Sequence, residues 1–245
     1  MRDFEGCNVV ITGGSSGIGL ATARRLVERG AEVCLVGRRP DALDGAVAEL
    51  GSRAWHVACD LGVPGEVDRL AEVVSARWEP VHGLVNNAGV APMADIRATD
   101  LATWNHTFAV NVRGPFQLIR GLLPGLERAG GAIVNVSSTL AERAIPGMVA
   151  YNASKAALNQ LTRSLALELA PAVRVNAVMP AVVDTPIHAA RGMGPEDVAA
   201  MAPLHPLGRV GRPEDVAALI AFLLSEEAAW MTGAVVPIDG GMMAG

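Results

Sequence analysis

The sequence has few charged residues, little lysine or tyrosine, and few cysteines. Charged residues make up 18% of its 245 residues and hydrophobic residues 51%. This composition excludes a disordered chain and a coiled coil, and it predicts a large buried core. The formal net charge is -5, without blocks of like charge, so electrostatics give no reason to expect nucleic acid or an anionic membrane. We therefore expect a small-molecule partner.

No hydrophobic run is long enough to cross a bilayer. The longest run, residues 216–224, falls far short of the roughly 20 residues that a membrane-spanning helix needs. The first residues include two acids, Asp3 and Glu5, and no signal-peptide core. The three cysteines, Cys7, Cys34 and Cys59, lack CxxC spacing, which is typical of reduced core thiols. These absences predict a cytoplasmic protein.

Short apolar runs alternate with amphipathic stretches along the chain, which is typical of repeated βα units on a parallel sheet. The strands are expected at Cys7–Thr12, Glu32–Gly37, Ala54–Ala58, Gly83–Asn86, Ala132–Ser137, Arg174–Val178 and Ala234–Pro237. The helices are expected at Ile18–Arg29, Asp41–Leu50, Pro64–Arg77, Leu101–Glu127, Val149–Leu169 and Pro213–Leu224. Without a linker, the prediction is one α/β domain over residues 1–245: a Rossmann-type doubly wound parallel sheet of seven strands, order 3-2-1-4-5-6-7, with helices on both faces.

One segment, residues 186–212, breaks this rhythm. It contains four prolines and weak periodicity, which indicates a mobile flap over the substrate rather than a core element.

The only lysine, Lys155, follows the only tyrosine, Tyr151, by four residues. This spacing places both side chains on one helical face. A phenol has a pKa of roughly 10, so it exchanges a proton at neutral pH only when a nearby positive charge favours the phenolate. The pair therefore predicts a tyrosine general acid or base assisted by an ammonium group. A merely solvated Lys155 is the weaker interpretation, because all other basic residues in this chain are arginine.

A glycine-rich turn, Thr12-Gly13-Gly14-Ser15-Ser16-Gly17-Ile18-Gly19, leads from the first expected strand into a helix. Glycines permit a tight turn, and the free amides of the helix N-terminus suit a pyrophosphate. An ordinary βα turn is the alternative.

Together with Asn86-Asn87-Ala88-Gly89, Asn111, Ser138 and Tyr151-x-x-Ser154-Lys155, this turn resembles the classical short-chain dehydrogenase/reductase family over essentially the whole chain. The resemblance implies a nicotinamide cofactor and four catalytic residues: Asn111, Ser138, Tyr151 and Lys155. In that assignment Ser138 donates a hydrogen bond to the developing alkoxide. Lys155 also binds the nicotinamide ribose, and Asn111 holds a water that links Lys155 to solvent. The resemblance also implies a homotetramer.

The cofactor-binding residues that the resemblance implies are Gly13, Ser15, Ser16, Gly17, Ile18, Gly19, Arg38, Arg39, Asp60, Leu61, Asn87, Ala88, Gly89, Tyr151, Lys155, Pro180, Val183 and Thr185. Asp60 is equally suited to cap the next helix. The family usually has Pro-Gly after the sixth strand, whereas this chain has Pro180-Ala181. Because alanine tolerates a positive φ less well than glycine, the loop is expected to have a slightly different shape.

The end of the second strand decides between NADP(H) and NAD(H). An acid there suits the 2′-hydroxyl of NAD, and an arginine suits the 2′-phosphate of NADP. Gly37 occupies the expected acidic position, and Arg38 and Arg39 follow it, so we expect NADP(H), with NAD(H) as the alternative. In the alternative the two arginines only solvate a loop, and Asp41 caps the next helix.

A substrate wall is expected from the loops beside the catalytic residues, comprising Thr139, Leu140, Met148, Val182 and His188. For His188 and His205, exposed loop positions are the stronger interpretation. The five histidines, His56, His82, His106, His188 and His205, show no metal-ligand spacing, so no metal site is expected. Trp104 and Phe108 are expected to pack together.

The sequence therefore favours an enzyme that transfers a hydride between NADP(H) and a ketone or secondary alcohol. A 3-oxoacyl-thioester reductase acting on an acyl carrier protein is an alternative, for which Arg128 and Arg174 are possible contacts. An NAD-dependent alcohol dehydrogenase is another. A non-catalytic nucleotide-binding sensor is disfavoured, because it has no reason to keep Lys155, Tyr151, Ser138 and Asn111 together.

Overall fold

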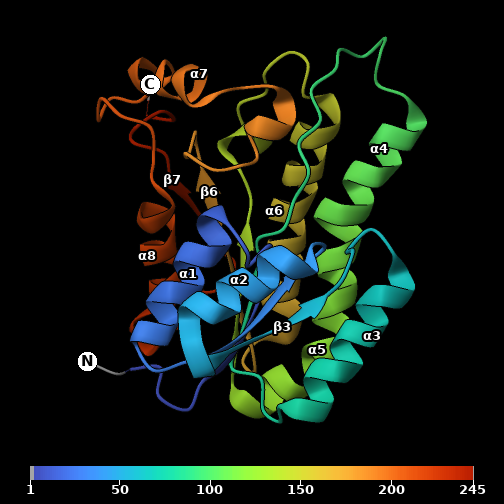
Figure 1. Cartoon of the computed structure of the whole chain (residues 1–245), viewed down its shortest axis with the longest axis vertical. Coiled ribbons are helices and arrows are strands. Elements are labelled where there is room, and N and C mark those ends of the chain that lie inside the picture. The colour runs from blue at the N-terminus through green and yellow to red at the C-terminus, as the bar shows by residue number, and fades with distance from the viewer. Residues whose placement is uncertain (1–2, 245) are drawn as a thin grey trace.

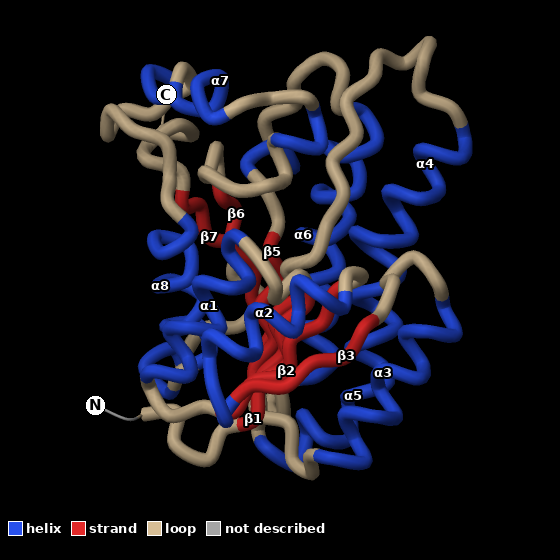
Figure 2. The backbone as a smooth tube through the Cα atoms, viewed as in Figure 1, coloured by secondary structure: helices blue, strands red, loops and turns tan. Residues whose placement is uncertain are grey.

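The computed structural model describes residues 3–244, and within them seven parallel strands form one sheet in the order β3-β2-β1-β4-β5-β6-β7 (Figure 2). The strands are β1 (Asn8–Thr12), β2 (Glu32–Gly37), β3 (Ala54–Ala58), β4 (Gly83–Asn86), β5 (Ala132–Val136), β6 (Arg174–Pro180) and β7 (Val235–Ile238). The doubly wound sheet and its strand order are as predicted.

Helices cover both faces of the sheet (Figure 1). They are α1 (Gly17–Glu28), α2 (Pro40–Leu50), α3 (Pro64–Arg77), α4 (Leu101–Phe108), α5 (Gly114–Ala129), α6 (Val149–Leu169), α7 (Pro195–Ala199) and α8 (Pro213–Leu224). Among the described residues, no helix is sufficiently long and apolar to traverse a bilayer.

The two faces of the sheet lie in separate hydrophobic layers because side chains alternate along each strand. In β1, Val9 and Ile11 pack in the layer that contains residues of α1, α2 and α8. Val10 faces the opposite layer, with residues of α3, α5 and α6. The same alternation in β2 places Leu35 in the first layer and Cys34 in the second. This double burial explains why the strands are apolar without a polar face.

The predicted helix Leu101–Glu127 is three segments instead of one. Helix α4 ends at Phe108, a π-helical turn covers Ala109–Arg113, and α5 begins at Gly114. The apolar periodicity continues through the turn and gave no sign of it. A π-helical turn inserts an extra residue and is frequent at functional sites. Here it contains Asn111.

The segment 186–212 contains short helical pieces, at Ala189–Arg191, Pro195–Ala199 and Ala202–Leu204. It is not simply an exposed loop, since His188 and His205 are both buried. This segment and the loop before α4 stand at the same end of the molecule, at the top of Figure 1.

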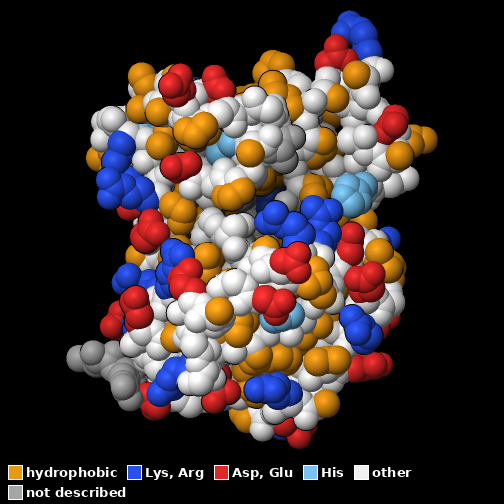
Figure 3. Space-filling view, viewed as in Figure 1, with side chains coloured by type: hydrophobic (Ala, Val, Ile, Leu, Met, Phe, Trp, Pro, Cys, Tyr) orange, Lys and Arg blue, Asp and Glu red, His pale blue; other side chains and the backbone are white. Residues whose placement is uncertain are grey.

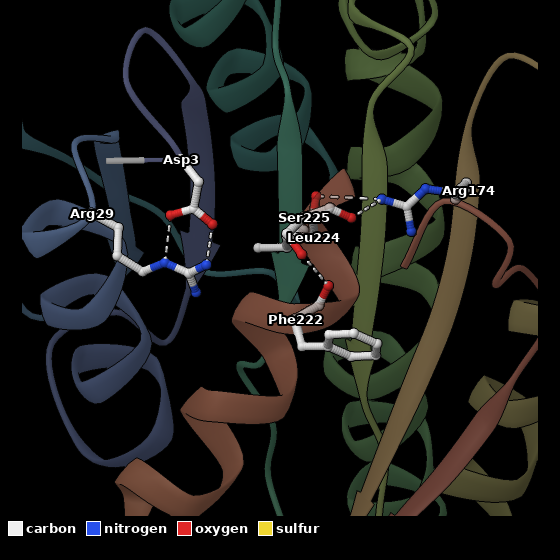
Figure 4. Close-up of polar contacts among 6 residues, drawn as sticks. All are labelled: Asp3, Arg29, Arg174, Phe222, Leu224 and Ser225. Carbon is white, nitrogen blue, oxygen red and sulfur yellow. Dashed lines mark hydrogen bonds and ion pairs between the residues drawn. The ribbon is translucent and has the colours of Figure 1, made fainter. Parts of the chain in front are cut away.

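Arg174 connects the sheet to the end of α8, as Figure 4 shows. From the start of β6 its guanidinium donates to the carbonyl oxygens of Leu223, Leu224 and Ser225, at 2.8, 3.3 and 3.1 Å. The hydroxyl of Ser225 in turn donates to the carbonyl of Phe222 at 2.8 Å. A cation at the C-terminal end of a helix also opposes the negative end of the helix dipole.

Arg174→Ala should therefore lower the free energy of unfolding by about 1–3 kcal/mol, because it leaves three carbonyl groups without their donor. The matched control is Arg128→Ala, which removes an exposed pair with Glu79 and should cost less than about 1 kcal/mol. Urea denaturation of the two variants measures both values. Equal effects of the two substitutions would show that Arg174 does not hold α8 to the sheet.

Candidate active site

Tyr151 and Lys155 lie one turn apart on the inner face of α6, and both are buried. The Lys155 ammonium donates to the carbonyl oxygen of Val136, at the end of β5, at 2.7 Å. Its Nζ lies 5.7 Å from the centroid of the Tyr151 ring. The only lysine and the only tyrosine of the chain are thus brought together at the carboxyl edge of the sheet.

Ser138 lies just beyond β5, on the loop that faces α6. Its Oγ accepts a hydrogen bond from the amide of Leu140 at 3.1 Å, which fixes the position of the oxygen and leaves its proton free to be donated. Burial raises the pKa of the Tyr151 phenol, while hydrogen bonding with Ser138 and the positive charge of Arg191 lower it. The phenol is therefore protonated at neutral pH, the state that a general acid needs.

The charge state of Lys155 follows from its burial. Burial lowers the pKa of Lys155 to about 8, so the ammonium is still mostly charged at pH 7. The groups that lower the pKa of Tyr151 are Ser138 and Arg191. The ammonium itself donates to the Val136 carbonyl and lies 5.7 Å from the centroid of the Tyr151 ring.

The side chain of Asn111 connects the loop after β4 to α6. Its Nδ2 donates to the Val90 carbonyl at 2.9 Å and to the Ser154 hydroxyl at 3.0 Å, and its Oδ1 accepts from the Val90 amide at 2.9 Å. Ser154 donates onward to the Tyr151 carbonyl at 2.8 Å. The π-helical turn, which contains Asn111, therefore positions the helix that carries Tyr151.

The glycine-rich turn is held against the end of β4. The Asn87 Nδ2 donates to the carbonyls of Thr12 and Gly13, at 2.9 and 3.2 Å, and the Thr12 hydroxyl accepts from the amides of Asn87 and Ala88, at 2.9 and 3.0 Å. A Cβ on Gly19 would lie 2.2 Å from the Gly13 oxygen, so no larger residue fits there. This close packing fixes the N-terminal end of α1.

A groove of about 210 Å³ runs along the carboxyl edge of the sheet. Its lining consists of Thr12, Gly13, Ser15, Ser16, Val36, Gly37, Arg38, Arg39, Cys59, Asp60, Leu61, Ala88, Gly89, Val90 and Val110. Nine of the cofactor residues that the sequence indicates therefore share one groove.

The residues around this groove fit a dinucleotide. The first turn of α1 has no acidic residue, and Ser16, at its N-cap, makes no side-chain cap, so its amides are available to a phosphate. A Cβ on Gly89 would lie 3.5 Å from Lys155 Nζ and 3.3 Å from Asn111 Oδ1. The missing side chain therefore leaves open the space between the groove and Lys155.

Arg38 and Arg39 follow β2 and are exposed. Figure 3 shows basic side chains gathered near the centre of this face. Asp41 is not the N-cap of α2: Arg39 is, and Asp41 lies in the first turn. Asp60 does not cap α3 either, because the N-cap is Val63, and the Asp60 Oδ1 accepts from the Gly62 amide at 2.8 Å.

The remaining cofactor candidates are not among the residues that line this groove. Gly17 and Ile18 begin α1, and Pro180 ends β6. A Cβ on Gly17 would lie 3.0 Å from the Thr185 methyl, so Thr185 packs against the glycine-rich turn. Among residues 3–244, glycine alone adopts positive φ, so Ala181 sits in ordinary backbone.

The five expected substrate-wall residues differ in their surroundings. Thr139 and Met148 are buried, and Leu140 is half-buried. Val182 and Val183 line a separate cavity of about 150 Å³ next to His205 and Gly240.

The prediction that His188 and His205 are exposed is wrong, because both side chains are buried. The His188 Nε2 lies 2.9 Å from the carbonyl oxygen of Val183, and burial lowers the pKa of His188. The His205 Nδ1 lies 3.1 Å from the Met201 carbonyl oxygen. Both imidazole rings thus contact backbone carbonyl oxygens in the interior of the protein. Trp104 and Phe108 stack with their ring centroids 4.8 Å apart, as predicted.

Three residues near the site carried no signal in the sequence. Val90 and Val110 line the groove, and Arg191 lies over Tyr151, with its Cζ 5.5 Å from the ring centroid. The prolines and glycines of 186–212 indicated a covering segment, but no spacing rule connects Arg191 to a residue so far back in the chain.

A family model described as enoyl-(acyl carrier protein) reductase matches residues 13–243. This match, the doubly wound sheet and the Tyr151–Lys155 site agree: the chain belongs to the classical short-chain dehydrogenase/reductase family.

Among its relatives is the cis-4-hydroxycyclohexanecarboxylate dehydrogenase of Sinomonas cyclohexanicum, 41% identical over 96% of each chain. The inactive 2-(S)-hydroxypropyl-CoM dehydrogenase 2 of Xanthobacter autotrophicus is 40% identical over 91% of this chain and 99% of its own. A solved short-chain dehydrogenase/reductase family protein superposes with a TM-score of 0.90 at 37% identity, covering 99% of this chain and all of its own.

Because Tyr151 is the only tyrosine, ultraviolet titration of tyrosinate reports on it alone. In the folded protein without cofactor the midpoint should lie above the roughly 10 of a free phenol, since burial raises the pKa. Ser138→Ala should move the midpoint higher still. The protein unfolded in guanidinium chloride is the control and should titrate near the free value. A folded midpoint at or below that control would contradict this description of the site.

Proposed function

We propose that this protein is an oxidoreductase that transfers a hydride between NADP(H) and a ketone or secondary alcohol. Its family membership supports the coarser statement, an NAD(P)-dependent oxidoreductase. The observation that carries the proposal is the buried Tyr151, with the Ser138 hydroxyl beside its phenol and the Lys155 ammonium one turn along the same helix face.

In the proposed reaction Tyr151 transfers the proton, and the cofactor donates or accepts the hydride. During reduction, Tyr151 donates its phenolic proton to the carbonyl oxygen of the substrate, and during alcohol oxidation it takes the proton back. Ser138 donates a hydrogen bond to the same oxygen, on which negative charge grows in the transition state. The charge of Lys155 favours the tyrosinate when the proton has left.

Gly13, Ser15 and Ser16, with the first turn of α1, would hold the pyrophosphate, and Lys155 would bind the nicotinamide ribose. Asn111 would hold a water beside Lys155. Pro180, Val183 and Thr185 would border the nicotinamide, and Asp60 and Leu61 the adenine. The substrate wall at Thr139, Leu140, Met148, Val182 and His188 belongs to this proposal as well.

NADP(H) is the proposed cofactor because of the groove beyond β2. No acid stands at Gly37, and the exposed Arg38 and Arg39 line the groove there. Two guanidinium groups suit a 2′-phosphate through charge-assisted hydrogen bonds. NAD(H) is the second candidate.

The alternatives have weaker support. For a reductase of carrier-protein thioesters, the two arginines considered as contacts are engaged elsewhere: Arg128 pairs with Glu79, and Arg174 binds the end of α8. A non-catalytic sensor has one point in its favour, the relative named as inactive. The intact Ser138, Tyr151 and Lys155 argue against it.

We also propose a homotetramer, a cytoplasmic location, and one domain in which 186–212 covers the substrate. Large apolar side chains exposed on α5 and α6, Phe116 and Leu167, support association through these helices. Cys7, Cys34 and Cys59 are free thiols, which fits a reducing compartment.

Tyr151→Phe should lower kcat for ketone reduction by about 10²- to 10⁴-fold, because the phenyl ring has no proton to give. NADPH oxidation followed by absorbance over a panel of ketones measures the loss, and fluorescence titration with NADPH should give a Kd close to that of the wild type. Turnover by the variant at the wild-type rate would refute the tyrosine mechanism. Tight NADPH binding by the wild type with no turnover across the panel would favour the sensor.

Arg38→Asp should reverse the cofactor preference. The loss of one charge-assisted contact and the addition of a like charge should weaken NADPH binding by at least about 10-fold, while NADH binding stays equal or improves. Arg97→Asp, which makes the same charge change on an exposed loop, is the control and should leave the ratio unchanged. If the two cofactors are used with equal efficiency before and after the substitution, the assignment of Arg38 fails.

A further inference from the structure

Arg191, at the end of the Ala189–Arg191 turn, bridges two loops above the proposed catalytic tyrosine. Its Nε donates to the carbonyl of Ala91, in the loop after β4, at 3.0 Å. Its Cζ lies 5.5 Å from the centroid of the Tyr151 ring. The guanidinium is therefore held at a fixed place beside the phenol, within the length of a small substrate.

This guanidinium has no counter-ion in the part of the chain that the structure describes. The ion pairs there join other arginines, such as Arg24, Arg128 and Arg209, to carboxylates. Nε makes the hydrogen bond to Ala91, and within residues 3–244 the two terminal nitrogens have no protein acceptor. Burial lowers the pKa of Arg191, and the group that opposes this shift is Tyr151.

The other charged and titratable neighbours do not neutralise Arg191. His188 faces it. Burial and the charge of Arg191 lower the pKa of that imidazole by more than the Val183 carbonyl and Asp184 raise it, so His188 is neutral at pH 7. Tyr151 is protonated at that pH because burial raises its pKa. A partly buried cation without an anionic partner is costly, and the remaining N–H groups form the planar fork that binds a carboxylate through two hydrogen bonds.

We propose that Arg191 determines specificity by binding a carboxylate on the substrate, so that the protein prefers oxo acids and hydroxy acids over neutral ketones and alcohols. The inference rests on the proposed function, because the reacting carbonyl must reach Tyr151 while the carboxylate reaches Arg191. Its fixed position also selects substrates in which the carboxylate and the carbonyl are separated by a defined length. Arg191 exchanges neither a proton nor a hydride itself, although its charge lowers the pKa of the Tyr151 phenol.

The test compares 4-oxopentanoate, 5-oxohexanoate and 6-oxoheptanoate with their methyl esters, in the presence of NADPH. The wild type should have a higher kcat/KM for the best acid than for its ester by at least about 10-fold, the size of a hydrogen-bonded charge pair. Arg191→Gln should remove this preference mainly through KM. The esters should change by less than about threefold, and in kcat, because the variant also raises the pKa of Tyr151 for every substrate. Arg191→Lys should restore part of the preference. Arg97→Gln is the matched control and should keep the preference.

Two further measurements separate the possible failures. Calorimetric titration of the acids into NADP⁺-loaded protein measures binding without turnover, and Arg191→Gln should weaken it by about 10- to 100-fold. Binding that depends on Arg191 without any turnover would leave this inference intact and overturn the proposed function. Turnover of esters and acids with equal efficiency, or an equal loss for both in Arg191→Gln, would overturn the inference and leave the proposed function standing. The Kd of NADPH should not change in Arg191→Gln, and a large change would assign the arginine to the cofactor.

Discussion

The functional end of this molecule depends on one buried hydrogen bond, from the Lys155 ammonium to the carbonyl of Val136. An isolated charge in a protein interior is unfavourable, so the ammonium must lie where backbone oxygens are free to accept it. The carboxyl end of a parallel strand supplies such an oxygen. The bond fixes the register of α6 against β5, and the same helix face carries Tyr151. The position of the Tyr151 phenol therefore follows from where the charge of Lys155 finds its hydrogen-bond acceptor.

Two asparagines connect this pair to the groove along the carboxyl edge of the sheet. Asn87 holds the glycine-rich turn against β4, and Asn111 holds the next loop against α6 through Val90 and Ser154. Both use an amide, which donates and accepts at once and so can join two backbone segments. A carboxylate in either place would have no donor for those carbonyls. Hydrogen bonds within the protein thus hold the two loops that border the groove.

The sequence predicted the sheet almost completely because each strand is marked by a local pattern of apolar residues. Apolar runs mark strands that are buried on both faces, and the first six lie within two residues of their expected ends, while β7 is shifted by one. Three features of the structure were not predicted from the sequence. The π-helical turn at Asn111 changes backbone hydrogen bonding without changing the apolar spacing. The burial of His188 and His205 depends on how 186–212 folds back on the body of the protein. The contact of Arg191 with Tyr151 depends on the path of the same segment, so it was not visible in any motif.

Arg191, which the sequence did not indicate, differs from the surface arginines because it has no carboxylate partner within residues 3–244. Arg24, Arg128 and Arg209 pair with carboxylates on the surface and contribute little beyond solubility. Arg38 follows β2 and Arg191 lies in the segment after β6, and neither has a carboxylate partner within residues 3–244. A net charge of -5 is therefore compatible with single arginines that lack a carboxylate partner. Charges that the fold leaves without a partner favour the binding of an anion, and at this edge the anions that we propose are the phosphates of the cofactor and the carboxylate of the substrate.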